Sequence, residues 1–307
     1  MQSLEKRIKN CWSIAVIMTV YNRSDKTKRC MESILKGTGS PIYQIDFFIT
    51  NDASTDNTVS IIEEYAKKIE DSKFHIINGT GSLFWNRGMH AALEEALKFD
   101  YDYYLFVNND VEFDNDFMAI ILNDALKASN ESRYFAICGS CHYINTKERS
   151  YGGARLLSRL NPYKREILIP NGNIQKCDLM NANCVLIPYD TAQAIGNLDS
   201  RYEHAVGDYD YGLRIKRKGG QCYIASDFVG ACDRNSDKGT WKDPSLSFKE
   251  RIRKKNQPNG LPWRSELIYL KTWFPFSWPY YLVRPYLVLL VTSLKYRVMN
   301  KQNNAVS

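Results

Sequence analysis

The sequence predicts an α/β protein built on an open, mostly parallel sheet that is flanked by helices. Apolar runs and helical periodicities alternate four times within about 130 residues, as in such sheets. The apolar runs are continuous rather than alternating, which is typical of strands buried on both faces. Each run ends in polar residues, and open parallel sheets bind their ligands at the carboxyl ends of the strands.

The first four strands are predicted from these apolar runs. They cover residues 13–20, 44–51, 73–79 and 101–111. The apolar stretch nearest the N-terminus is only about eight residues long, which is too short for a secretory or membrane-spanning segment. We therefore expect it to be the first strand.

Four helices are expected from apolar residues at helical spacing. They cover residues 26–36, 56–68, 86–100 and 116–128. Either Thr55 or Asp56 can cap the second helix. Met89, Leu93 and Leu97 share one face of the third.

After residue 128 the alternation becomes less regular. We expect strands at residues 134–144 and 177–188, a hairpin and loop at 149–172, and helices at 190–195 and 208–218. With 307 residues, the chain suits one large domain or one domain with an elaborated tail.

Positive charge is concentrated toward the C-terminus. The net charge is +7, yet residues 235–307 hold 13 Lys and Arg against 4 Asp and Glu, a net +9, which leaves a net −2 for residues 1–234. A basic tail on a nearly neutral body suggests contact with an anionic surface, either nucleic acid or phospholipid.

Several common ligand motifs are absent. The first turn, YNRSDKT, has no glycine, which excludes a dinucleotide fingerprint and a glycine-rich nucleotidylyltransferase loop, and no P-loop is present. The 8 cysteines include one lone C-x-x-C pair, Cys138 and Cys141, without a second pair at zinc-finger spacing. We expect free thiols in a reducing cytoplasm, several of them in the core.

Carboxylates at strand and helix ends remain as the candidates for chemistry. Asp52 can accept a hydrogen bond from a base N–H, or cap a helix. Asp110 can hold a divalent ion that substrate phosphates complete, or form an Asx-turn. Asp208 and Asp210 stand near a helix start, which the helix macrodipole favours, but together with His204 they also suit proton transfer.

Six stretches, in order, resemble family 2 of the nucleotide-sugar glycosyltransferases. They are VIMTVYNRSDKTKRCMESIL, ITNDASTDNT, GSLFWNRGMHAALEEAL, LFVNNDVEFD, NANCVLIP with AIGNLD, and GDYDYGLRIKRKG. The resemblance covers roughly residues 12–225 and is closest to the bacterial surface-polysaccharide, rhamnosyltransferase-like type. It implies a GT-A fold over residues 1–234, with a donor half at about 12–130 and an acceptor half at about 131–234, followed by a helical C-terminal extension at 235–307.

The resemblance also implies where the donor nucleotide binds. In the family's D-D-x-S-x-D turn the second acid contacts the base, so that Asp52 takes this role, although Asn51 replaces the first acid. Thr19 and Tyr21 correspond to the other side of the base pocket.

Further donor contacts follow from two more motifs. Arg87 in WNRG resembles the basic residue near the diphosphate, and Trp85 either stacks on the nucleotide or packs. Asn109 lies within the stretch that corresponds to the metal motif and is expected to contact the donor.

The family's metal motif, D-x-D, is here residues 108–110, NND, so only Asp110 keeps its acid. The resemblance implies that Asp110 holds Mg²⁺ or Mn²⁺ against the diphosphate, and the ion neutralises charge on the leaving group. The family's late histidine ligand is missing here, and Asp233, Cys232 or water would take its place.

The general base of the family is the aspartate of an E-D pair, which corresponds to Asp208, with Gly207 in place of the glutamate. Asp208 would take the proton of an acceptor hydroxyl as that oxygen attacks the anomeric carbon, with inversion. Asp210 would support it or cap the helix, and His204 would line the acceptor pocket or simply pack.

The C-terminal extension is basic and then rich in aromatic and aliphatic residues. Its apolar stretch is interrupted by Arg284 and by Pro275, Pro279 and Pro285, which argues against a membrane-spanning helix. We expect an interfacial segment at the inner face of the cytoplasmic membrane, and the alternative is a helix packed on the domain. The resemblance argues against nucleic acid as the partner.

Taken together, the resemblance predicts an inverting, metal-dependent transferase. The donor would be a UDP- or dTDP-sugar carrying a hexose such as rhamnose, glucose or galactose. The acceptor would be a polyprenyl-diphosphate-linked saccharide of a growing surface polysaccharide. The alternative is a non-catalytic nucleotide-sugar-binding or membrane scaffold protein, because one acid is replaced in each of the D-D-x-S-x-D turn, the D-x-D motif and the E-D pair. A third possibility is a nucleic-acid-binding protein that uses the basic tail.

Overall fold

The first strand shows why the apolar runs of this chain are continuous. In β1, Trp12–Val20, the side chains of Val16 and Met18 enter one buried core cluster, whereas those of Ala15 and Ile17 enter a second one. Consecutive side chains point to opposite faces of a sheet, so that a strand between two cores has no polar face. The computed structural model describes residues 11–36 and 43–304.

The strands are β1 Trp12–Val20, β2 Tyr43–Asn51, β3 Phe74–Asn78, β4 Tyr103–Asn108, β5 Glu112–Phe113, β6 Phe135–His142, β7 Arg149–Tyr151, β8 Ala154–Leu156, β9 Arg165–Ile167, β10 Gln175–Cys177, β11 Cys184–Pro188 and β12 Gln221–Ala231. The helices are α1 Ser24–Lys36, α2 Thr58–Lys68, α3 Phe84–Ala96, α4 Phe117–Glu131, α5 Tyr189–Ile195, α6 Gly207–Arg217, α7 Phe248–Lys255, α8 Trp263–Trp273 and α9 Trp278–Asn304.

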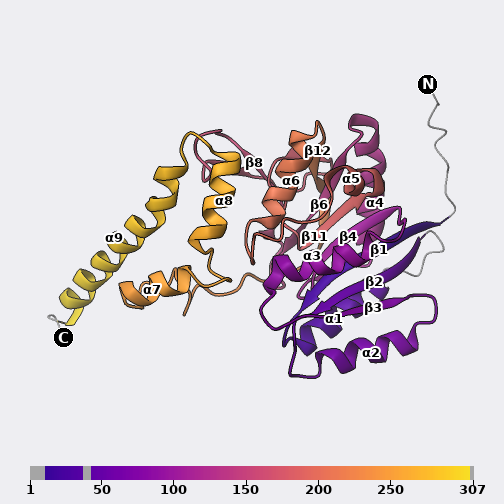
Figure 1. Ribbon diagram of the computed structural model, residues 1–307, viewed down its shortest axis with the longest axis horizontal. Helices are drawn as coiled ribbons and strands as arrows, with labels where there is room; N and C mark the ends of the chain where they lie inside the picture. The colour runs from indigo at the N-terminus through magenta and orange to yellow at the C-terminus, as the bar shows by residue number, and fades with distance from the viewer. Residues whose placement is uncertain (1–10, 37–42, 305–307) are drawn as a thin grey trace.

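The central sheet has 10 strands in the order β10-β12-β6-β11-β4-β1-β2-β3, with β5 paired to β12 and β7 to β6 (Figure 1). The four strands β3, β2, β1 and β4 are parallel, as predicted, and β6 and β12 are parallel to each other. β11 runs antiparallel between β4 and β6. β8 and β9 form a small hairpin of their own within the predicted hairpin region.

Helices cover both faces of the sheet. Side chains of α1, α2 and α4 enter the first core cluster, and those of α3, α5 and α6 enter the second. The N-cap residue of α2 is Asn57, whose side chain makes no capping hydrogen bond, so that neither predicted cap, Thr55 or Asp56, occupies this position. Asp56, one residue earlier, accepts the Thr58 N–H at 3.0 Å.

Two features of the core bear on the predictions. All 8 cysteines are free, and all but Cys11 are buried, as expected for core thiols. The 11-residue strand β12 was not predicted, because its register shifts between Ile224 and Phe228 and a polar pair, Ser226 and Asp227, interrupts its apolar run.

The C-terminal extension forms three helices on one side of the sheet, opposite β3 and α2 (Figure 1). A third core cluster joins Tyr269 and Leu270 of α8 to Leu213 of α6, so that the extension packs on the domain. α9 continues through Pro285. Among the described residues, no helix is long and apolar enough to cross a membrane.

Candidate active site

The carboxyl ends of β1 and β4 and the start of α6 border one cavity of about 360 Å³, which we call the smaller cavity. Five of the predicted site residues line it: Thr19, Trp85, Asn109, Asp110 and Asp208. These residues come from four separate segments, and the parallel topology brings them together because strand ends of one direction meet at one edge.

Asp110 is surrounded by cations. One oxygen of its carboxylate lies 2.9 Å from Arg23 Nη1 and 3.7 Å from Lys26 Nζ, and the other accepts a weak hydrogen bond from the Cys232 thiol at 3.8 Å. Arg23 also lines the smaller cavity, so that the turn after β1 supplies the positive charge at this place. Sequence reasoning missed Arg23 and Lys26, although the stretch YNRSDKT contains both.

A metal ion at Asp110 would depend on substrate oxygens. Among the described residues, no group of three or more His, Cys, Asp or Glu could hold an ion. Burial and the nearby Asp110 raise the pKa of the Cys232 thiol to about 12, so that it is protonated, and Asp233 accepts the Ile144 N–H at 3.0 Å. One carboxylate fits Mg²⁺ or Mn²⁺ only where phosphates and water complete the coordination shell.

Polar side chains connect the wall of the smaller cavity. Trp85 Nε1 donates to Asn108 Oδ1 at 2.6 Å, and the amide of Asn108 in turn donates to Asn183 Oδ1. The buried atoms Asn183 Nδ2 and Asn181 Oδ1 have no partner in the described chain. Both residues line the smaller cavity, which gives its wall further amide groups. Asn109 is tied back to Thr27 at 2.9 Å.

Asp208 sits in the first turn of α6 and is held only by backbone groups in the described chain. Its carboxylate accepts the N–H of Tyr209 at 2.9 Å and that of Ala182 at 3.3 Å. Burial raises the pKa of Asp208 to about 6, and the backbone hydrogen bonds oppose this shift only in part. A carboxylate with this pKa is ionised at neutral pH and is a stronger base than an exposed aspartate.

The backbone that carries Asp208 is tightly constrained. A Cβ on Gly207 would stand 1.7 Å from Asn86 Oδ1, so no side chain fits at this position. Asn86 is fully buried and donates to the carbonyls of Asp199 and Tyr202. Val206, just before α6, has a left-handed φ of 64°, which is costly for a β-branched residue and is typical of functional sites.

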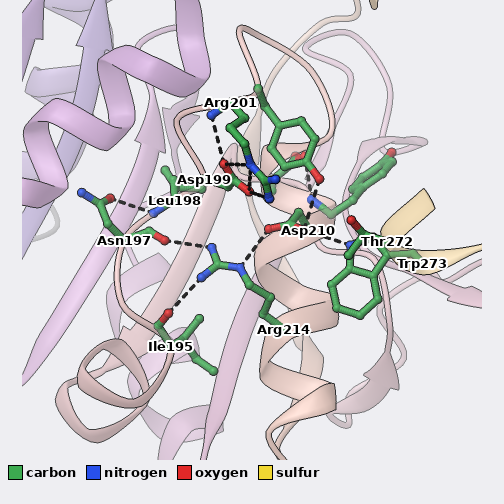
Figure 2. Close-up of polar contacts among 12 residues, drawn as sticks. Ile195, Asn197, Leu198, Asp199, Arg201, Asp210, Arg214, Thr272 and Trp273 are labelled. Atoms are coloured by element: carbon green, nitrogen blue, oxygen red, sulfur yellow. Dashed lines mark hydrogen bonds and ion pairs between the residues drawn. The ribbon is translucent and has the colours of Figure 1, made fainter. Parts of the chain in front are cut away.

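Asp210 has a structural role. Its carboxylate is buried, pairs with Arg214 Nε at 2.8 Å and accepts the indole N–H of Trp273 at 2.9 Å (Figure 2). Arg214 donates its remaining N–H groups to the carbonyls of Ile195 and Asn197. Asp210 therefore connects α6 to the C-terminal helix α8 rather than capping α6.

A second cavity of about 700 Å³, which we call the larger cavity, adjoins the smaller one. His204, Asn181 and Tyr209 line both. Burial and the neighbouring Arg23 lower the pKa of His204 to about 4, so that its ring is neutral, and Nδ1 accepts the Trp85 N–H at 3.4 Å. His204 thus borders both cavities, and its role toward an acceptor stays a prediction.

Three predicted donor residues lie outside the smaller cavity. Tyr21 is 54% exposed just after β1. Asp52 is 4% exposed and accepts the N–H groups of Gly81, Leu83 and Phe84 at 2.7–3.0 Å, so that it caps α3. Of the two roles considered for Asp52, the structure shows the helix cap, and the capped helix is distant from Asp52 in sequence.

Arg87 is the third of these residues. Its Nε donates to the Ser200 carbonyl at 3.1 Å, and its guanidinium faces Glu203 at 4.0 Å. The arginine that the structure brings beside Asp110 is Arg23 instead.

Comparison with known proteins gives a matching family, a related sequence and two structures of similar fold. A family model described as glycosyl transferase family 2 matches residues 15–186. The chain is 33% identical over 87 residues to the uncharacterized glycosyltransferase YibD of Escherichia coli (strain K12). That match covers 28% of this chain and 24% of YibD, so it spans about a quarter of that protein.

Two solved structures are similar in fold. The mannosyltransferase PcManGT from Pyrobaculum calidifontis, in complex with GDP-Man and Mn²⁺, matches with a TM-score of 0.52 and 13% identity, over 95% of this chain and 79% of that one. GalNAc-T7 with UDP, GalNAc and Mn²⁺ matches with a TM-score of 0.57 and 15% identity, over 75% of this chain and 45% of that one. At these identities the likeness concerns the fold alone.

Proposed function

The chain belongs to glycosyl transferase family 2, and from this premise we propose that it transfers a hexose, with inversion, from a UDP- or dTDP-sugar to a hydroxyl of a lipid-linked saccharide. Its mostly parallel sheet, flanking helices and C-terminal helices are GT-A-like, as predicted. Glycosyltransferase activity follows from the family. The donor, the acceptor, the stereochemical outcome and a role in surface polysaccharide synthesis are our proposal.

One observation carries this proposal: Asp110 and Asp208 line the same cavity but have opposite surroundings. Asp110 lies among cations that can also neutralise a diphosphate. Asp208 is held by N–H groups and has a raised pKa, which suits a base. In the proposed reaction, the acceptor oxygen attacks the anomeric carbon, its proton goes to Asp208, and the nucleoside diphosphate leaves.

We assign the donor contacts as follows. Thr19 and Tyr21 would border the base, and Asp52, whose Oδ1 accepts only the Gly81 N–H in the described chain, keeps a lone pair for a base N–H. Trp85 and Asn109 would face the sugar diphosphate from the cavity wall.

Positive charge would hold the diphosphate of the donor. Arg23 and Lys26 would stand beside it, and Arg87 stays a prediction because its side chain lies outside the smaller cavity. Asp110 would hold Mg²⁺ or Mn²⁺, and the bound ion would neutralise charge on the leaving group.

The base assignment is tested with Asp208→Asn. We expect transfer to fall by about 10²–10⁴-fold, because the acceptor proton loses its destination, while UDP or dTDP binding stays within about twofold. Transfer and nucleotide binding are measured separately, by product formation and by calorimetry. Asp227→Asn, which changes an exposed carboxylate on β12, is the matched control.

Two results would count against these assignments. Full turnover by the Asp208→Asn variant would remove the base role. If the wild type releases no nucleoside diphosphate from any UDP- or dTDP-sugar, with or without acceptor, the non-catalytic scaffold becomes the better account.

The metal assignment is tested with Asp110→Asn. Removing this carboxylate should weaken Mn²⁺-assisted nucleotide binding by about tenfold or more, since Asp110 lines the smaller cavity and the other candidate ligands, Asp233 and Cys232, do not. Calorimetric titrations of UDP and dTDP with Mn²⁺ and with EDTA measure this difference. Equal Mn²⁺ dependence in the variant and in the wild type would make Asp110 a turn residue.

The C-terminal extension would place the enzyme at the inner face of the cytoplasmic membrane. Exposed apolar side chains on α9 support this, at Val283, Leu287, Val291, Leu294 and Val298. Their spacing of three or four residues puts them along one side of the helix. A lipid-linked acceptor would be reached from this position.

A further inference from the structure

Three arginines converge on the larger cavity from separate segments. Arg149 comes from β7, Arg165 from β9, and Arg234 from the segment after β12. Among the described residues that line this cavity, Asp237 is the only acid, and it pairs with Lys242 at 3.3 Å. The cavity therefore carries an excess of positive charge.

None of the three guanidiniums forms an ion pair with an Asp or Glu of the described chain. Arg165 donates to the Tyr209 hydroxyl at 3.3 Å, and Arg234 donates to the Ser150 carbonyl at 2.7 Å. Arg149 donates to the Gly153 carbonyl at 3.1 Å, and its buried Nε has no partner. These arginines contact neutral groups only, so their charges are left for a ligand.

The folded chain holds these charges together at a cost. Burial lowers the pKa of Arg149, and the proximity of Arg234 and Arg165 lowers it further. Arg149 is half-buried, whereas Arg165 and Arg234 are exposed. A partly buried cation without an acidic partner, beside a cavity that two further arginines line, indicates an anionic ligand. Guanidinium groups bind phosphate through paired N–H donors, which makes phosphate the oxyanion that suits three arginines.

The arginine cluster lies next to the proposed base. Tyr209, which receives the Arg165 hydrogen bond, directly follows Asp208 and lines both cavities. Arg149 and Arg234 also border a shallow pocket with the exposed side chains of Ile167 and Ile169. Charged and apolar side chains thus meet in this pocket.

We propose that Arg149, Arg165 and Arg234 bind a phosphate or diphosphate group of the acceptor, and that this contact brings the acceptor hydroxyl to Asp208. The inference rests on the proposed function, because it names the chemistry of the acceptor in that reaction. It assigns the larger cavity to a phosphate-bearing saccharide rather than to a neutral sugar.

Binding of inorganic diphosphate to the metal-free protein tests the site directly. We expect the double variant Arg149→Gln with Arg234→Gln to weaken diphosphate binding at least tenfold by calorimetry. Arg155→Gln is the matched control, because Arg155 is exposed and pairs with Glu166 outside the cavity, and it should bind as the wild type does. Arg23→Gln should weaken only the diphosphate binding in the smaller cavity, where the donor is proposed to bind.

A third variant keeps the test independent of folding. Arg165 is exposed and bonds only to Tyr209 in the described chain, so that Arg165→Gln should fold normally and still weaken diphosphate binding several-fold. Unchanged affinity in both the double variant and Arg165→Gln would overturn the proposal. Binding of glucuronate but not of diphosphate would also overturn it, in favour of a carboxylate-bearing acceptor.

Activity separates this inference from the proposed function. The double variant should hydrolyse the donor sugar without acceptor as fast as the wild type, yet lose transfer to a phosphate-bearing acceptor. Loss of donor hydrolysis together with transfer would contradict an acceptor role for the arginines. A wild type that binds diphosphate at this cluster but never cleaves a donor would overturn the proposed function and leave the anion site standing.

Discussion

Burial of Asp208 increases its basicity and also reduces the stability of the folded protein. The pKa of this carboxyl is raised from 3.8 to about 6 because the ionised form is poorly solvated. The loss of folding free energy is absent at pH values below the pKa of Asp208 in the unfolded chain. It is complete at pH values above the pKa of Asp208 in the folded protein. At neutral pH the folded protein therefore carries the full penalty.

This linkage predicts how Asp208→Asn changes stability with pH. Between pH 4.5 and pH 7.5 the wild type should lose roughly 2 kcal/mol relative to the variant, which has no charge to bury. Urea unfolding of both proteins at the two pH values measures the change. Asp227→Asn, on an exposed carboxylate, should give parallel pH curves.

A constant difference between the wild type and Asp208→Asn across this range would show that the carboxyl is well solvated. The pH dependence of transfer provides a second measurement of the pKa of Asp208. Its acidic limb should lie near pH 6, because the ionised form accepts the proton.

Sequence motifs predicted which segments meet but not how each side chain points. Thr19, Trp85 and Asp110 reach one cavity because strand ends of a parallel sheet converge. Arg87 and Asp52 stand at the expected chain positions, yet hydrogen bonds to distant loop residues decide their orientation. Such contacts form only after folding and leave no local signal.

The basic run of α7 shows the same limit for an element. Two of its cations are buried inside the extension rather than facing an anionic surface. Arg251 donates to Thr292 and Ser293 of α9, and Lys255 forms a buried ion pair with Glu266 of α8 at 2.7 Å. Part of the positive charge of the tail therefore holds its three helices together.

α9 has a buried side and an exposed apolar side. Leu289 and Ser293 are buried, whereas Leu287, Val291 and Leu294 are exposed. The prolines interrupt the apolar run of the sequence but not the helix. Pro279 lies in the first turn, where its missing N–H is not needed, and the helix continues through Pro285.

The exposed side of α9 predicts vesicle binding that polar substitutions remove. The triple change Leu287→Gln, Val291→Gln and Leu294→Gln should reduce co-sedimentation with phosphatidylglycerol vesicles at least tenfold, because each buried aliphatic side chain contributes about 1 kcal/mol or more. Leu126→Gln, on the exposed side of α4, is the control. Undiminished sedimentation of the triple variant would mean that α9 is not the membrane contact.

For the molecule as a whole, the sequence predicted residues 12–130 better than residues 131–234. The first of these regions holds four parallel strands that alternate with helices, in the sheet order β4-β1-β2-β3, and periodicity can detect this alternation. The second region depends on the antiparallel β11, the bulged β12 and short hairpins. The arginine cluster of this region is assembled from three separate segments, and no spacing in the sequence predicts it.

The link between Asp210 and Trp273 determines where this protein can be divided. Composition changes at residue 235, but the packing continues across it, because Trp273 of α8 donates to a carboxylate two residues from the proposed base. A fragment that stops at residue 234 would leave Asp210 without this donor and uncover one side of α6. A shortened enzyme intended for crystallisation or for assays in solution should therefore keep α8, and removal of α9 would in turn leave the buried Arg251 without Thr292 and Ser293.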